Sequence, residues 1–239
     1  MKKFDLIILT TAVNRSDLHT LCLSPITSLL KELRVKWLIN IDKVSDESVT
    51  DTENNLKKIL NAANIDLEIF HSTRPCFFTA VKMLSQKASH YLSKTRYGVF
   101  ILEDDWPVKI DPNTVELKTL LDTCLMTDGD YISFKNRNEL NFNPSIFSKH
   151  LFNVNFIGGF AKNVYEPRDP ELIVCDAAWL DENGTRSESL KPTKIHEYDW
   201  FYGPEVGREW VKNTLKKRKW NKWNKGSGHD PMSNLTYWN

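Results

Sequence analysis

The chain has 239 residues, and its 32 Lys and Arg against 31 Asp and Glu give a formal net charge of +1. A charge so near zero argues against a protein whose overall field binds nucleic acid or anionic lipid. No apolar run approaches the roughly 20 residues that a membrane helix needs. The length fits one α/β domain, so we expect residues 1–239 to fold as a single unit.

The first half of the chain, residues 1–135, alternates strand and helix patterns. Pro25 is expected to kink or split the first helix, and Ser16 to cap it, with Asp17 in its first turn. Strands alternating with helices imply a mostly parallel sheet with helices on both faces. Apolar β-branched runs predict strands at 4–11, 35–41, 66–70, 97–102 and 131–134, and amphipathic stretches predict helices at 16–34, 51–63, 77–93 and 115–126.

The second half, residues 136–239, has a weaker pattern. A strand at 156–161, containing Gly158-Gly159, and a helix from 204 to about 217 are the elements we predict there. Seven Lys and Arg and no acid lie between Val211 and Gly228, and five of the eight tryptophans lie in the last forty residues. A solvated basic helix face and a surface that binds phosphate or sugar are both open interpretations.

The N-terminus superficially resembles a signal peptide. Asp5 interrupts its apolar run, and Asn14-Arg15 stands where a small-residue cleavage site is expected, so we interpret the run as a core strand. The four cysteines lie about fifty residues apart without a CxxC pair, which predicts reduced, mostly buried thiols. These features favour a cytoplasmic protein without a signal peptide.

Three consecutive carboxylates, Glu103, Asp104 and Asp105, directly follow the strand expected at 97–102. In extended backbone, Glu103 and Asp105 share one side while Asp104 points away. Two hard oxygen donors two residues apart suit Mn²⁺ or Mg²⁺ that takes its other ligands from water and a diphosphate. Ligands bind at the carboxyl ends of parallel strands, which favours a metal site over the alternative of an acidic turn that caps the next element.

The stretch ILEDDW, about a hundred residues after FDLIILTT, resembles the DXD-type motif of nucleotide-sugar-dependent glycosyltransferases with the GT-A fold. Similarity extends to Ser72-Thr73-Arg74 before the helix at 77–93, to the FIGGF strand, and to the segment that opens with Gly203-Pro204-Glu205. The first motif residue here is Glu rather than Asp. The resemblance implies a Rossmann-like domain in which residues 1–135 bind the nucleotide-sugar and residues 136–239 form an irregular acceptor-binding region.

The resemblance also implies a role for each site residue. Asp105 coordinates the metal, with Glu103 and the tail residue His229 as further ligands, and Glu103 and Asp104 contact the ribose or metal-bound water. Each residue has a structural alternative, such as a turn cap for Asp42 or a surface ion pair for Arg74. The residues expected to line the nucleotide pocket are Thr10, Thr11, Arg15, Asp42 and Arg74.

Glycosyl transfer develops charge on the leaving diphosphate, which a divalent ion stabilises. An inverting enzyme also needs a carboxylate that takes the proton of the acceptor hydroxyl. Glu205 is the preferred base because it opens a predicted helix, where a carboxylate stays ionised. Asp199, in the aromatic stretch HEYDW, is the second candidate, and a helix cap or a surface charge is the alternative for each.

We therefore predict an inverting, Mn²⁺- or Mg²⁺-dependent glycosyltransferase that moves a sugar from a UDP- or GDP-sugar to a glycan or other hydroxyl acceptor. Nucleic acid is not an expected partner. A sugar-phosphate nucleotidyltransferase is one alternative, although residues 10–15 lack the glycines that usually hold a triphosphate. A non-catalytic carbohydrate- or nucleic-acid-binding module built on the basic, Trp-rich tail is the other.

Overall fold

The computed structural model describes residues 3–43, 47–72, 77–127, 129–134, 144–153, 156, 194–203 and 206. The strands are β1 (Phe4–Val13), β2 (Val35–Asp42), β3 (Ile65–His71), β4 (Thr95–Ile101), β5 (Asp130–Ser133), β6 (Ser145–Ser148) and β7 (Lys194–Glu197). The helices are α1 (Ser16–Cys22), α2 (Ile26–Leu29), α3 (Val49–Ile59), α4 (Phe77–Leu92), α5 (Leu117–Cys124) and α6 (Lys149–Phe152).

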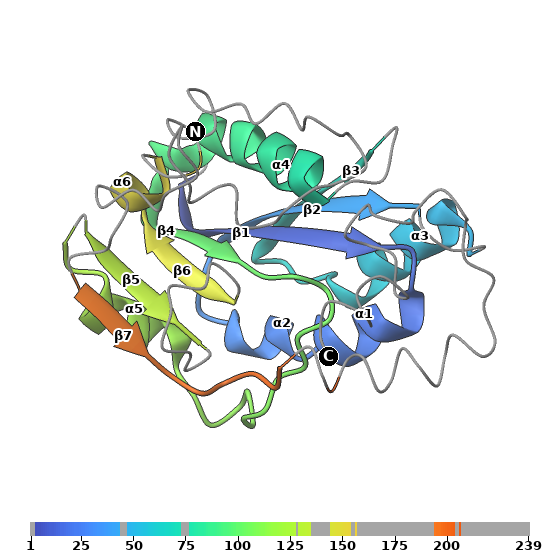
Figure 1. The fold of residues 1–239 in the computed structure, drawn as a ribbon. Coiled ribbons are helices and arrows are strands. Elements are labelled where there is room, and N and C mark those ends of the chain that lie inside the picture. Colours follow the sequence, from blue (N-terminus) through green and yellow to red (C-terminus); the bar gives the residue numbers. More distant parts are fainter. Residues whose placement is uncertain are drawn as a thin grey trace, which may run out of the picture.

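The strands form one seven-stranded sheet in the order β3-β2-β1-β4-β6-β5-β7 (Figure 1). The pairs β1–β2, β2–β3, β1–β4 and β5–β7 are parallel. Strand β6 runs antiparallel to both of its neighbours, β4 and β5. The sheet is therefore mostly parallel, as the alternation of strands and helices predicts.

Helices cover both faces of this sheet, and the side chains of β1 alternate between them. Leu6 and Ile8 pack in a core with residues of α2, α3 and α5. Ile7 and Leu9 face the opposite core, which includes residues of α4 and α6. Figure 1 shows α4 above the sheet and α1 and α2 below it. Burial on both faces explains why β1 is a nearly continuous apolar run instead of an alternating pattern.

The helix predicted at 16–34 is divided at Pro25 into α1 and α2, as expected. The cap predicted at Ser16 is wrong, because Ser16 is the first helical residue and Arg15 precedes it. The amide of Ser16 donates to Oε1 of Glu47 at 3.0 Å. A carboxylate from the next loop thus takes the place of the expected capping hydroxyl.

Strands β6 and β7 were not predicted from the sequence. Each has four residues, which is too short to show a periodic pattern. Next to β6, Gly98 of β4 is required, because an added Cβ would lie 1.9 Å from the backbone oxygen of Phe147. Phe156 is helical, not extended as predicted, and residues 157–161 of that predicted strand lie outside the described residues. Of the helix predicted from 204 to 217, the structure describes Val206 alone.

Within the described part of the chain, no helix is both long and apolar enough to cross a membrane. Cys22 and Cys124 are buried and form no disulfide, in line with the predicted thiols. Cys76 and Cys175 lie outside the described residues.

Candidate active site

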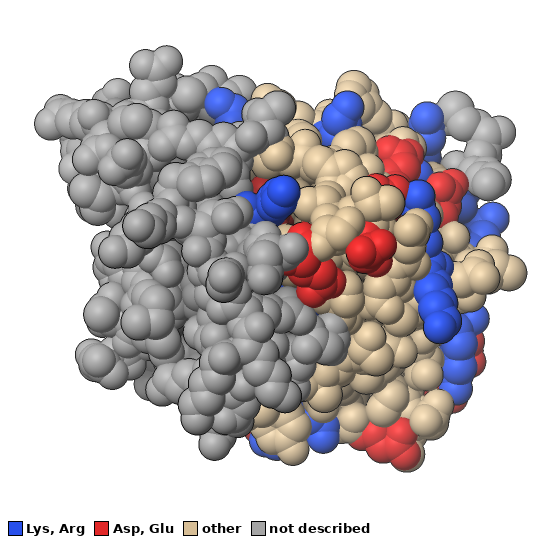
Figure 2. All heavy atoms as spheres, turned by 90° about the vertical axis from the view of Figure 1, so that its right-hand side faces the viewer, with Lys and Arg blue, Asp and Glu red and all other residues tan. Residues whose placement is uncertain are grey.

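The carboxyl ends of β1, β2 and β4 meet at one edge of the sheet (Figure 1). The β1–β4 ladder continues past the end of β4, because Leu102 N donates to Leu9 O at 2.9 Å and Asp104 N donates to Thr11 O at 3.3 Å. The acidic triplet is therefore held in register beside the end of β1. Figure 2 looks onto this edge and shows Asp and Glu side chains in the middle of the described surface, with Lys and Arg near them.

The carboxylate of Asp104 is turned into the protein, where its side chain is 5% exposed. Its Oδ2 accepts hydrogen bonds from the amide of Val13 at 3.0 Å and from Nε2 of His19 at 3.1 Å. Its Oδ1 accepts from Nη2 of Arg15, also at 3.1 Å. We call these four residues the Asp104 cluster, and it ties the turn after β4 to the loop between β1 and α1.

The charge of Asp104 is stabilised by this cluster. Burial alone raises the pKa of Asp104, but Arg15, His19 and the amide of Val13 outweigh burial and lower it to about 2. The neighbouring carboxylates of Glu103 and Asp105 are half-buried. The acidic triplet thus divides into one internal carboxylate and two that border the surface. The predicted contact of Asp104 with ribose or metal-bound water stays a prediction.

Two buried residues of α1, His19 and Cys22, lie beneath the triplet and have no signal in the sequence that marks them as part of a site. His19 is fully buried on α1, and its Nδ1 has no hydrogen-bond partner among the described residues. Cys22 lies one turn further along α1, where burial and the charges of Asp105 and Asp104 raise the pKa of its thiol. The thiol is therefore neutral, and a neutral group beneath two carboxylates adds no repulsion.

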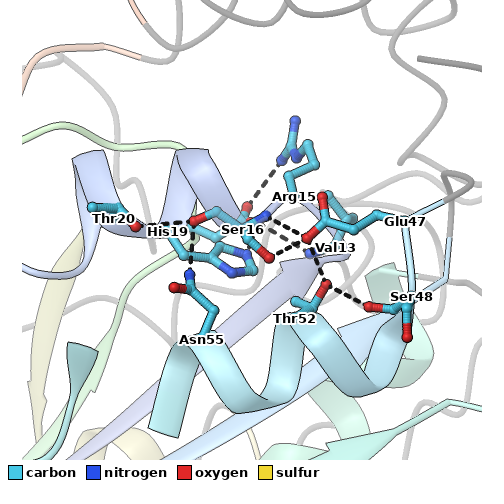
Figure 3. Close-up of polar contacts among 10 residues, drawn as sticks. Val13, Arg15, Ser16, His19, Thr20, Glu47, Ser48, Thr52 and Asn55 are labelled. Atoms are coloured by element: carbon cyan, nitrogen blue, oxygen red, sulfur yellow. Dashed lines mark hydrogen bonds and ion pairs between the residues drawn. The ribbon is translucent and has the colours of Figure 1, made fainter. Parts of the chain in front are cut away.

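A second cluster fixes the β1–α1 loop against α3 (Figure 3). Glu47 accepts hydrogen bonds from the amide and hydroxyl of Ser16 and, at 3.0 Å, from the hydroxyl of Thr52. Asn14 donates from Nδ2 to the backbone oxygen of Glu47 at 2.7 Å, and Asn55 donates to the backbone oxygen of Ser16 at 2.9 Å. This Glu47 cluster holds the start of α1, which carries His19, in place.

The predicted nucleotide-pocket residues at the ends of β1 and β2 are buried. The hydroxyl of Thr10 accepts from Nε1 of Trp37 at 2.9 Å, so it contacts the core. Thr11 is 7% exposed. Asp42 is fully buried, and its Oδ1 accepts from Nδ2 of Asn40 at 2.9 Å. The structure brings these residues to one sheet edge with Arg15, while their contacts with a nucleotide stay predictions.

The segment after β7 lies against the segment that follows the acidic triplet. Lys109 N donates to Trp200 O at 2.8 Å, and Tyr202 N donates to Pro107 O at 2.9 Å. Asp199 forms an ion pair with Lys109, and the Asp199 side chain is 52% exposed. The chain therefore enters the Gly203-Pro204-Glu205 stretch from beside residue 107, two positions after Asp105.

Three predicted site residues, Arg74, Glu205 and His229, lie outside the described residues, so their roles stay predictions. The described residues contain no group of three or more Asp, Glu, His or Cys side chains that could hold a metal ion. The donors at the triplet are the oxygens of Glu103 and Asp105. Two hard oxygen donors fit Mn²⁺ or Mg²⁺ that completes its shell with water and substrate phosphates.

No protein-family model and no curated protein matches the chain. Solved structures do resemble it: the S. aureus TarS fragment 1–349 has a TM-score of 0.53 at 11% identity, over 89% of this chain and 65% of that one. A structure of S. aureus TarS has a TM-score of 0.50 at 12% identity, over 92% and 41%. The mannosyltransferase PcManGT from Pyrobaculum calidifontis, in complex with GDP-Man and Mn²⁺, has a TM-score of 0.48 at 13% identity, over 98% and 70%.

The likeness to TarS is a likeness of fold. It confirms the predicted fold class, a GT-A-like α/β fold with a mostly parallel sheet and helices on both faces. The chain spans 65% of the TarS fragment. Activity and substrates therefore have to be argued from this chain's own residues.

Proposed function

We propose that the chain is an inverting, metal-dependent glycosyltransferase that moves a sugar from a UDP- or GDP-sugar to a hydroxyl group of a glycan or similar acceptor. The observation that carries this proposal is the division of the acidic triplet. Asp104 is internal, while Glu103 and Asp105 are half-buried at the carboxyl end of β4, beside the ends of β1 and β2. Ligands bind at this edge of parallel sheets.

In this proposal Asp105 holds a Mn²⁺ or Mg²⁺ ion, with Glu103 and His229 as further ligands. The ion stabilises the negative charge that develops on the diphosphate as the glycosidic bond breaks. Arg15 supports the same edge with positive charge, since its guanidinium is within hydrogen-bond distance of the motif. Thr10, Thr11, Asp42 and Arg74 form the walls of the nucleotide pocket.

Inversion requires a carboxylate that accepts the proton of the acceptor hydroxyl. Asp199 forms an ion pair with Lys109, which follows Asp105 by four residues. For Asp199 to act as the base, this ion pair would have to open. We therefore keep Glu205 as the preferred base, because Tyr202, three residues before it in the sequence, is hydrogen-bonded to Pro107, two residues after Asp105.

Isothermal titration with UDP, GDP and their sugars, with and without Mn²⁺, tests the proposal. We expect binding that Mn²⁺ strengthens and that Asp105→Asn weakens. Asp51→Asn is the matched control, because Asp51 is exposed in the first turn of α3. Absence of nucleotide binding under every condition contradicts the proposal. Release of pyrophosphate from a nucleoside triphosphate, without sugar transfer, favours the nucleotidyltransferase alternative instead.

A further inference from the structure

His19 is a buried residue with a contact to the acidic motif. We propose that His19 is a positioning residue of the metal–diphosphate site: by holding Asp104, it fixes the turn that presents Glu103 and Asp105. This inference rests on the proposed function, since it concerns the same site. It adds a residue that has no contact with solvent and that no motif in the sequence marks.

The hydrogen bond between His19 and Asp104 has a defined direction. Both oxygens of the Asp104 carboxylate already act as acceptors, Oδ2 for the amide of Val13 and Oδ1 for Nη2 of Arg15. Nε2 of His19, 3.1 Å from Oδ2, must therefore carry the proton and donate it. The same oxygen accepts the amide of Val13, so a helix side chain and a strand-end amide converge on one atom.

Arg15 and His19 each contact one oxygen of Asp104, and the two side chains differ in their exposure to solvent. The Arg15 side chain is 11% exposed, so part of it stays accessible at the edge of the sheet while its Nη2 donates to Asp104. The His19 side chain is 0% exposed, so it acts on a ligand through Asp104 alone.

The position of Asp104 determines the turn around it. Its amide donates to Thr11 O, and its carboxylate joins the loop between β1 and α1. Glu103 and Asp105 are its direct neighbours, so a shift of Asp104 moves both carboxylates. In metal sites, loss of a group that orients a ligand typically weakens metal affinity by about 10- to 100-fold. We expect the loss of the His19 side chain to weaken metal affinity by a factor within this range.

The test compares His19→Gln with His19→Asn. Glutamine places an amide donor near the position of Nε2, whereas asparagine is too short to reach Asp104. The control is His90→Asn, because His90 is exposed on α4. Four quantities are measured: Mn²⁺ affinity in the presence of UDP or GDP by electron paramagnetic resonance, nucleotide affinity without metal, the melting temperature, and hydrogen exchange of the Val13 and Asp104 amides in metal-free protein.

We expect His19→Asn to weaken Mn²⁺ binding by about 10-fold or more and to speed exchange of the two amides, with metal-free nucleotide affinity within about twofold. His19→Gln should restore most of both properties, and His90→Asn should change neither. Equal Mn²⁺ affinity in the folded asparagine and wild-type proteins overturns the inference, as does an equal loss in the glutamine variant.

The exchange measurement separates this inference from the proposed function. If wild-type protein binds neither Mn²⁺ nor nucleotide, the proposed function fails, and with it the role of His19 at a metal. Faster exchange in His19→Asn alone would then show that His19 orders the turn without serving a metal site.

Discussion

Two ionic clusters among the described residues, the Asp104 cluster and a cluster around Lys36, differ in which charge is buried. In the Asp104 cluster the carboxylate is sealed from water. In the Lys36 cluster the ammonium group is buried, since the Lys36 side chain is 3% exposed, while its partners Asp66 and Glu68 are 35% and 37% exposed. Tyr91 of α4 completes it, donating to Glu68 at 2.6 Å and lying under the ammonium.

The difference shows what each cluster does. Burial lowers the pKa of Lys36, but hydrogen bonds with Asp66 and Glu68 reverse the effect and raise it. The carboxylates of Asp66 and Glu68 stay hydrated, so the Lys36 cluster joins β2, β3 and α4 with a small desolvation cost. Asp104 loses its water and depends on its protein partners. Burying a charge costs free energy, and the partners of Asp104 offset this cost. The same partners hold in place the turn that carries the half-buried carboxylates of Glu103 and Asp105.

The largest expected effect is on catalysis. Asp105→Asn removes the charge that would hold the divalent ion, and we expect metal-dependent transfer to fall by about 100-fold or more. Turnover is measured as nucleoside diphosphate released from the donor. Asp51→Asn should retain wild-type turnover, and an Asp105→Asn enzyme as active as that control would refute the assignment of Asp105.

The second expected effect is a difference in the free energy of unfolding between variants of the Asp104 cluster and of the Lys36 cluster. Asp104→Asn leaves Arg15 and His19 without their counter-charge, and we expect it to lower the free energy of unfolding by about 3 kcal/mol. Asp66→Asn, at a half-exposed carboxylate, should cost less than about 1 kcal/mol. Urea unfolding followed by circular dichroism measures both. Similar costs for the two variants would show that burial of Asp104 does not distinguish the clusters.

The third effect is a dependence of stability on acid. Because the pKa of Asp104 is lowered from 3.8 to about 2, its contribution is complete above the unfolded-state pKa and is lost as the pH falls through about 2. The shift corresponds to roughly 2 kcal/mol. Urea unfolding between pH 5 and pH 2 should show a smaller loss of stability for Asp104→Asn than for wild type. If the unfolding free energies of the variant and the wild type fell in parallel with pH, the low pKa of Asp104 would be contradicted.

The smallest effect is expected at the Lys36 cluster. Lys36→Met keeps the buried stem and leaves two carboxylates that water can reach, so we expect a cost of about 1 kcal/mol. Sugar transfer should stay within about twofold of wild type, because Lys36 lies in β2 away from the carboxyl end of the sheet. A large loss of transfer would show that the two clusters are coupled.

The strands that form the centre of the sheet could be predicted from their apolar runs, because burial on both faces leaves a clear signal in β1, β2 and β4. Strands β6 and β7 could not, since four residues of mixed polarity resemble a loop. The division at Pro25 follows from local backbone chemistry. The cap of α1 does not, because Glu47 comes from a loop 31 residues away from Ser16.

The acidic triplet could be predicted as a candidate site from its place after a strand. The inward position of Asp104 fits the alternation expected of extended residues, but its partners were not predictable. His19 lies 85 residues from Asp104 in sequence, and a lone histidine in a helix carries no local signal of such a contact. Arg15 was expected at the nucleotide pocket, and its ion pair with Asp104 emerged from the packing of the loop.

A crystal structure with Mn²⁺ and UDP or GDP is the most direct test of the proposed site. We expect an ion bound by Asp105, with Glu103 beside it, and the diphosphate at the ends of β1 and β4. The Asp104 carboxylate should still accept hydrogen bonds from Val13, Arg15 and His19. An ion coordinated by Asp104 with the cluster opened, or a nucleotide bound away from this edge of the sheet, would contradict it.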